Sequence, residues 1–133
     1  MPTGSEARGE RPDEGLPAAR RLRATGLFAE AYDQNRCQRG RYMLLWLRRG
    51  PDAALRLGVV TSRKVGDAVA RVKARRRMRE LFRRRRSQMH GAFDVVLIAR
   101  ASLPDAPWAE LVQDFQKLAA RAGLLASGTG QGI

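Results

Sequence analysis

The sequence predicts a single α+β domain, a two-layer α/β sandwich in which helices cover one face of a small, mostly antiparallel sheet. Two observations support this. Three short apolar runs of strand length, residues 41–49, 55–61 and 94–100, alternate with three segments of helical periodicity, giving the order helix, strand, strand, helix, strand, helix. With 133 residues, the chain is long enough for one hydrophobic core and short for two ordinary domains.

The first helix and strand follow from residue spacing. Leu27, Phe28 and Tyr32 recur at helical intervals, which predicts a short helix that ends near Asn35. Residues 41–49, RYMLLWLRR, form an apolar run bounded by turn-forming residues, which predicts a strand followed by a hairpin.

The second predicted strand, residues 55–61 (LRLGVVT), contains a glycine. A glycine inside a strand indicates a bulge or a close backbone approach, so Gly58 is expected to mark one of these. Turn-forming residues at Gly66 and Asp67 then precede a long helix that is expected to end before His90. Its predicted apolar stripe consists of Val69, Val72, Met78, Leu81 and Phe82.

The last two elements complete the sheet and its cover. Residues 94–100 are almost wholly apolar and include β-branched residues, which is typical of a strand in mid-sheet. A final amphipathic helix is predicted from Pro107 to Gly123. The domain thus spans residues 21–124. Residues 1–20 and 125–133 have the composition of disordered tails.

Charge is the strongest functional signal. The chain carries 26 Lys and Arg against 13 Asp and Glu, a net charge of +13. Between Arg71 and Arg86, sixteen positions hold ten basic residues and a single acid, Glu80. A solvated helix face explains charges of mixed sign better than this excess, so we expect a nucleic acid partner. No apolar run reaches the roughly 18 residues of a membrane span, and a cytoplasmic location without membrane contact is expected.

The sequence predicts no catalytic site and no metal site in the protein itself. Cys37 is the single cysteine and His90 the single histidine, so no disulfide or zinc site of the usual kind can form. The acidic residues are scattered, and none are paired in the manner of a two-metal phosphoryl site. Binding is therefore favoured over catalysis.

Phosphate binding is expected from five cations that the helical spacing places on an exposed arc: Arg71, Lys73, Arg75, Arg76 and Arg79. Three aromatic residues could fill the core or offer stacking surfaces to unpaired bases, and core filling is favoured from sequence alone: Phe28, Tyr32 and Trp46.

The stretch TSRKVGDAVARVKARRRMRELFR, with RLRATGLFAEAY before it and FDVVLIARAS after it, resembles the protein component of bacterial ribonuclease P. The resemblance covers roughly residues 20 to 123. It implies a sandwich of the ribosomal protein S5 domain 2-like type, with a left-handed β-α-β crossover. It also implies a subunit of an endoribonuclease whose catalytic RNA removes the 5′ leader of precursor tRNA, with Mg²⁺ held mainly by the RNA. No protein partner is implied.

By this resemblance, the RNA-contacting positions are Arg63, Lys64, Arg71, Lys73, Arg75, Arg76 and Arg79. The three aromatic residues Phe28, Tyr32 and Trp46 match positions that hold the single-stranded leader. The chain departs from the family's Arg-Asn-Arg motif at Val72 and Lys73, and from its paired lysines at Arg63. A general RNA-binding module such as a ribosomal protein is the alternative, and a membrane-binding helix ranks third.

Overall fold

The computed structural model describes residues 21–22 and 25–125. The helices and strands described are α1 (Thr25–Gln34), β1 (Arg36–Arg39), β2 (Met43–Arg49), β3 (Leu57–Val60), α2 (Ala68–Arg85), β4 (Phe93–Ala99) and α3 (Trp108–Ala122). Every predicted element is present, and β1 is an addition. The predicted N-terminal tail, 1–20, and all but the first residue of the predicted C-terminal tail, 125–133, lie outside the described residues.

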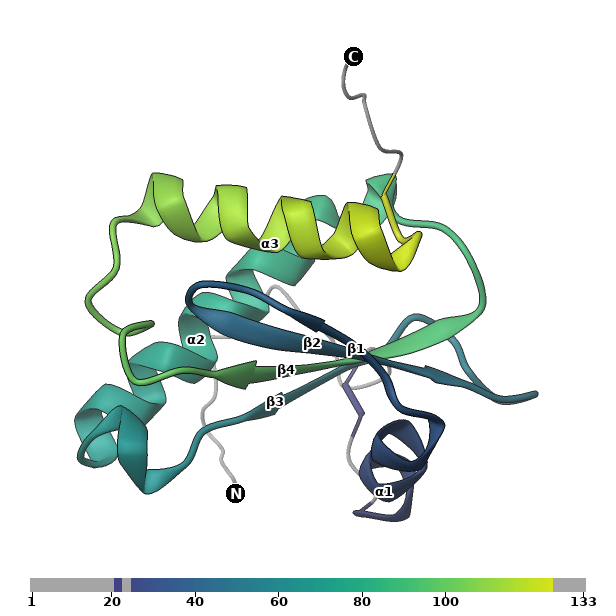
Figure 1. The fold of residues 1–133 in the computed structure, drawn as a ribbon, viewed down its shortest axis with the longest axis horizontal. Helices are drawn as coiled ribbons and strands as arrows, with labels where there is room; N and C mark the ends of the chain where they lie inside the picture. Colours follow the sequence, from purple (N-terminus) through teal and green to yellow (C-terminus); the bar gives the residue numbers. More distant parts are fainter. Residues whose placement is uncertain (1–20, 23–24, 126–133) are drawn as a thin grey trace.

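The described strands form one sheet in the order β1-β2-β4-β3 (Figure 1). β2 pairs antiparallel with both β1 and β4, whereas β3 pairs parallel with β4. The sheet is thus mostly antiparallel, as predicted. The chain passes from β3 through α2 to β4, so these elements form a β-α-β unit with parallel strands.

The predicted hairpin between the strands at 41–49 and 55–61 is wrong. β4 lies between β2 and β3, and the hairpin partner of β2 is β1. The sequence of β4 is apolar on both faces, which suits a central position. β1 reads RCQR and has no apolar alternation, so this short edge strand left no signal in the sequence.

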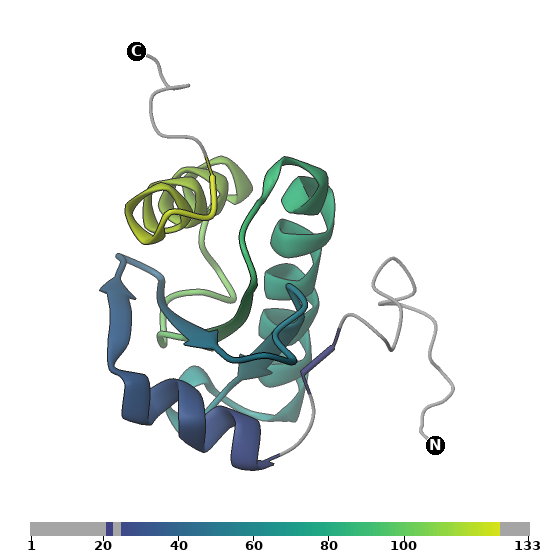
Figure 2. The same cartoon turned by 90° about the vertical axis from the view of Figure 1, so that its right-hand side faces the viewer.

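The helices divide between the two faces of the sheet. α2 and α3 lie on one face and α1 lies on the other (Figures 1 and 2). In β4, Val95 and Leu97 pack in the core under α2 and α3, whereas Val96 packs in the cluster under α1. The prediction that helices cover one face is therefore correct for α2 and α3 and wrong for α1. Because both faces of β4 are apolar, both need cover.

A buried ion pair joins β2 to β4 on the α1 side. Nη1 of Arg48 donates a 2.8 Å hydrogen bond to Oδ2 of Asp94, which is fully buried. Arg56 binds both carboxylate oxygens of Asp94, and Nε of Arg48 also binds Glu30 of α1. Burial alone would raise the pKa of Asp94, but these hydrogen bonds and those from two backbone N–H groups outweigh burial and lower it. The network ties α1 to the sheet.

The ends of α2 follow the predicted signals. Oδ1 of Asp67 accepts a 2.9 Å hydrogen bond from the N–H of Ala70 and caps the helix, after Gly66 has turned the chain with a φ of 136°. After Arg85 a short 3₁₀ turn continues to Gln88, so the helical segment ends before His90 as predicted. Among the described residues, no helix has both the length and the apolar character needed to cross a membrane.

Candidate RNA interface

The three aromatic residues predicted to hold the leader lie together on the α1 face. Phe28 and Tyr32 are one turn apart on α1, and Trp46 lies on β2 beneath them. The rings of Tyr32 and Trp46 meet edge to face, with centroids 5.2 Å apart and planes at 79°. Phe28 and Trp46 pack against the same apolar cluster of buried side chains.

Gly58 of β3 makes room for this cluster. A Cβ atom at this position would lie 2.5 Å from Cζ of Phe28, so the phenyl ring rests directly on the β3 backbone. The close backbone approach predicted for Gly58 is thereby confirmed. The absence of a side chain at this position is what lets the α1 ring reach the sheet.

The aromatic residues are only partly enclosed. Tyr32 is 37% exposed, and Phe28 and Trp46 are partly buried. Nε1 of Trp46 is buried yet has no hydrogen-bond partner in the described structure. Burial raises the pKa of the Tyr32 hydroxyl, which therefore remains protonated at neutral pH. These three residues thus contribute to the core while offering an aromatic edge and the Tyr32 hydroxyl to a ligand.

The same face continues as a strip of partly exposed residues. The strand register places Leu44, Ile98 and Val60 side by side in one row across the sheet. This row lies two residues along β2 from Trp46, on the same face. Arg39 of the edge strand β1 pairs with Leu44 and ends the row. Leu44, Ile98 and Val60 are neither fully buried nor fully exposed. An extended chain crossing this strip would meet apolar surface and one cation.

The apolar stripe of α2 differs from the predicted one. Met78, Leu81 and Phe82 are buried as predicted, together with Ala74. Val69 and Val72 point away from the core and are 76% and 44% exposed. In a helix with about 3.6 residues per turn, positions 74, 78, 81 and 82 share one face, whereas 69 and 72 lie outside it. Their inclusion in the predicted stripe was wrong.

The predicted RNA-contacting cations of α2 extend from its β3 flank to its α3 flank. On the β3 side, Nη1 of Arg75 donates a 2.9 Å hydrogen bond to Oγ1 of Thr61, and Nη1 of Arg71 donates to the carbonyl of Gly66. On the α3 side, Nζ of Lys73 lies 3.8 Å from Oδ1 of Asp105.

Arg76 lies between these flanks and is exposed, with no hydrogen bond or ion pair to any described residue. Arg79 is partly buried. Arg63 and Lys64 are exposed in the 3₁₀ turn between β3 and α2. The structure therefore brings Arg63, Lys64, Arg71 and Arg75 to the C-terminal end of β3, and separates Lys73 from them.

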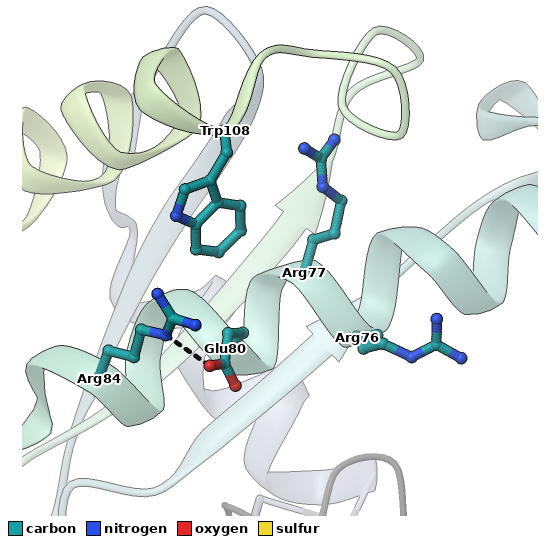
Figure 3. Close-up of a pocket in the computed structure, with 5 residues that line it drawn as sticks. All are labelled: Arg76, Arg77, Glu80, Arg84 and Trp108. Carbon is teal, nitrogen blue, oxygen red and sulfur yellow. Dashed lines mark hydrogen bonds and ion pairs between the residues drawn. The ribbon is translucent and has the colours of Figure 1, made fainter.

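The α3 flank also holds residues that were not among the predicted RNA-contacting positions. Arg77, Glu80 and Arg84 line a groove there with Trp108, the first residue of α3 (Figure 3). The intervals of three and four residues between positions 73, 77, 80 and 84 are the signal that could have grouped them on one face. Within the described part of the chain, no three His, Cys, Asp or Glu side chains are placed to hold a metal ion.

Known proteins match both the sequence and the fold. A family model described as Ribonuclease P matches residues 16–123. The ribonuclease P protein component of Thermus thermophilus is 37% identical over 124 residues, which cover 91% of this chain and 71% of the relative. The corresponding protein of Symbiobacterium thermophilum is 35% identical over 111 residues, covering 83% and 96% respectively.

Solved structures of ribonuclease P proteins have a similar fold. The ribonuclease P protein of Thermotoga maritima matches with a TM-score of 0.68 at 28% identity, covering 76% of this chain and 96% of that one. A mutant of the Staphylococcus aureus protein gives a TM-score of 0.73 at 25% identity, covering 80% and 91%. The family match spans α1 to α3, including both the aromatic cluster and α2. The chain therefore belongs to the family of bacterial ribonuclease P protein components.

Proposed function

We propose that this chain, as the protein subunit of ribonuclease P, holds the single-stranded 5′ leader of precursor tRNA on its α1 face and binds the catalytic RNA through α2. The observation that carries the proposal is the junction at the end of β3. Val60 packs against the same buried apolar cluster as Phe28 and Trp46, and the next residue, Thr61, accepts the hydrogen bond from Arg75 of α2. Aromatic and cationic surfaces are thus continuous.

Each surface has the chemistry that its proposed ligand requires. Bases of any identity can stack on an aromatic ring, so the Tyr32 and Trp46 edge suits leaders of differing sequence. The guanidinium groups of Arg71 and Arg75 at the neighbouring end of α2 suit phosphate oxygens, which they bind through planar, paired donors. A strand leaving the aromatic cluster would meet these cations next.

Catalysis is proposed to belong to the RNA subunit, with Mg²⁺ held mainly by RNA. The protein would contribute charge: its net +13 offsets the mutual repulsion of phosphates where RNA and precursor tRNA meet. The protein should therefore lower the Mg²⁺ concentration that cleavage requires. We place this activity in the cytoplasm.

Val72 stands where the family motif has asparagine, and its side chain is 44% exposed. Valine neither donates nor accepts a hydrogen bond, so contact with RNA at this position would be apolar. Phosphate binding would then rest on the surrounding cations.

The test is cleavage of a precursor tRNA by the cognate catalytic RNA at a range of Mg²⁺ concentrations, with and without the protein. We expect the protein to move the Mg²⁺ midpoint to lower concentration. In parallel, affinity is compared for precursor tRNA and for the same tRNA trimmed to its mature 5′ end, with tighter binding expected for the precursor. An unmoved midpoint together with equal affinities would indicate a general RNA-binding module and would contradict the proposal.

A further inference from the structure

A groove of about 390 Å³ lies on the α3 flank of α2, away from the aromatic cluster. It is lined by Arg76, Arg77, Glu80, Arg84 and Trp108. Figure 3 shows the Trp108 ring suspended between the start of α3 and α2, with Arg84 below it and Arg77 beside it. The volume falls within the range of about 300–1,000 Å³ that is usual for small-ligand sites.

Two of the lining residues, Arg77 and Glu80, are already hydrogen-bonded to other residues of the protein. Arg77 donates hydrogen bonds to the carbonyl oxygens of Leu103, Pro104 and Ala106, and so holds the loop that leads into α3. Glu80 accepts hydrogen bonds from Arg83 and Arg84 at 2.6 and 2.5 Å. The hydrogen bonds from Arg83 and Arg84 lower the pKa of Glu80 to about 2, so it remains charged and paired at neutral pH.

The other three residues, Trp108, Arg84 and Arg76, keep exposed surface, although Nε of Arg84 is bound to Glu80. Trp108 is only partly buried, and the guanidinium carbons of Arg77 and Arg84 lie 5.7 and 5.6 Å from its ring centroid. The Arg84 side chain is 54% exposed, and the described structure gives its terminal nitrogens no hydrogen bond. Arg76 is exposed, lines the groove and extends away from the ring (Figure 3).

We propose that this groove binds one unpaired nucleotide of RNA, whose base stacks on Trp108 beside Arg84 while Arg76 binds a neighbouring phosphate. The inference rests on the proposed RNA-binding function. Indole and guanidinium planes both stack on nucleobases, and the unpaired Arg76 favours an anionic ligand. Carboxylate ligands could pair with the arginines but would gain little from the indole ring.

The proposed nucleotide belongs to a different RNA segment from the leader. Trp108 and Lys73 lie on the α3 flank of α2, whereas Arg75 contacts Thr61 on the β3 flank. Trp46 lies on the opposite face of the sheet from α2 and α3. A strand bound against the aromatic cluster would have to pass around α2 to reach Trp108. The catalytic RNA is the source that we commit to.

The two tryptophans permit a direct test, because the chain has only Trp46 and Trp108. In Trp46→Phe, Trp108 is the single indole, and its emission is followed as the cognate catalytic RNA is added without precursor tRNA. We expect a change in Trp108 emission that saturates together with RNA binding measured by gel shift. In Trp108→Phe, the emission of Trp46 is expected to change only when precursor tRNA carrying a leader is added.

Two matched variants locate the contact. Arg84→Ala and Arg83→Ala each remove one charge and one partner of Glu80, but only Arg84 lines the groove. In the Trp46→Phe background, Arg84→Ala should reduce the emission change and Arg83→Ala should preserve it. Trp108→Leu should weaken binding of the catalytic RNA at least about fivefold, and Trp108→Phe should retain most of the affinity. Circular dichroism verifies that each variant is folded.

Trp108 emission that stays constant while gel shift shows saturated RNA binding would overturn the nucleotide site and leave the proposed function intact. Equal effects of Arg84→Ala and Arg83→Ala would overturn it as well, since general charge would then explain the change. Absence of RNA binding by every form of the protein would instead count against the proposed function. If Trp108→Leu leaves RNA affinity unchanged, the groove serves a protein partner or none.

Discussion

Tyr32 and Trp46 meet edge to face with ring centroids 5.2 Å apart, although one belongs to a helix and the other to a strand. The contact depends on the position of α1 against the sheet. Two other contacts fix this position: the Phe28 ring rests on Gly58, and Glu30 binds Arg48. α1 is therefore held against the sheet at both a packed and a charged contact. The aromatic surface is built into the fold instead of being a chance exposure.

Replacing Tyr32 tests the leader site with little harm to the core, because this side chain is 37% exposed. Tyr32→Ala should weaken binding of leader-bearing precursor tRNA by about 1–3 kcal/mol, the usual value of one base–aromatic stack. Tyr32→Phe retains the ring and should bind nearly as well as the wild type. The measurement is equilibrium binding of precursor and mature tRNA to each variant assembled with the catalytic RNA. An equal loss for both tRNAs would show that Tyr32 does not contact the leader.

Arg76 offers a clean test of phosphate binding, because it has no partner among the described residues. Arg76→Ala should weaken binding of the catalytic RNA and reduce the slope of log affinity against log salt by about 1. Lys117→Ala, which removes an exposed cation from α3, should leave the slope unchanged. Equal slopes for the wild type and Arg76→Ala would mean that this part of α2 is merely solvated.

Asp94 should be essential for stability, because it is fully buried between Arg48 and Arg56. Asp94→Asn leaves buried Arg48 short of a partner and should lower the free energy of unfolding by about 3 kcal/mol, as measured by urea denaturation at pH 7. Asp105→Asn, at a side chain 96% exposed, should change it by less than about 0.5 kcal/mol.

The stability contributed by Asp94 should depend on pH. Its pKa in the folded protein is lowered, so the contribution is complete above the unfolded value of about 3.9 and is lost as the pH falls below that value. The difference between the wild type and Asp94→Asn should therefore shrink in acid. A difference that is the same at pH 3 and pH 7 would show that the carboxylate charge is not what stabilises the fold.

Local patterns in the sequence were sufficient to predict most elements, and the errors have physical causes. Apolar runs predicted β2, β3 and β4, but their order in the sheet depends on which strand can be covered on both faces, a property of the assembled molecule. β1 reads RCQR and its residues are half-buried or exposed, so it carries no apolar run, whereas β3, the other edge strand, does. α1 lies on the second face of the sheet because β4 is apolar on both faces, and α1 covers the face opposite α2 and α3.

The candidate site was predictable in composition and less so in arrangement. Basic residues could be counted in the sequence, yet Arg75 and Lys73 proved to lie on opposite flanks of α2, bound to Thr61 and Asp105. Arg77 was not distinguishable from its neighbours, although it holds the loop before α3. Thr61 and Asp105 are more than a dozen positions from the cations that they bind, so these contacts could not be inferred from spacing along α2.

Glu80 limits how much of α2 is available to RNA, because it is the only acid between Arg71 and Arg86 and it binds both Arg83 and Arg84. Glu80→Gln should release these two cations, so that the catalytic RNA binds more tightly and the salt slope becomes steeper by about 1–2. The hydrogen bonds from Arg83 and Arg84 lower the pKa of Glu80 to about 2, so the carboxylate is charged at neutral pH and the comparison is made there.

The same change should make the protein slightly less stable, since helix pairs of this kind contribute about 0.5 kcal/mol each. Because the pKa of Glu80 is lowered, that contribution is present above the unfolded pKa of about 4.3 and disappears as the pH falls towards 2.

For the RNA-binding measurement, Glu110→Gln removes one negative charge from α3 and serves as the control for net charge. If both variants strengthen RNA binding equally, the effect is one of overall charge. If Glu80→Gln alone steepens the salt slope, Glu80 withholds Arg83 and Arg84 from phosphate.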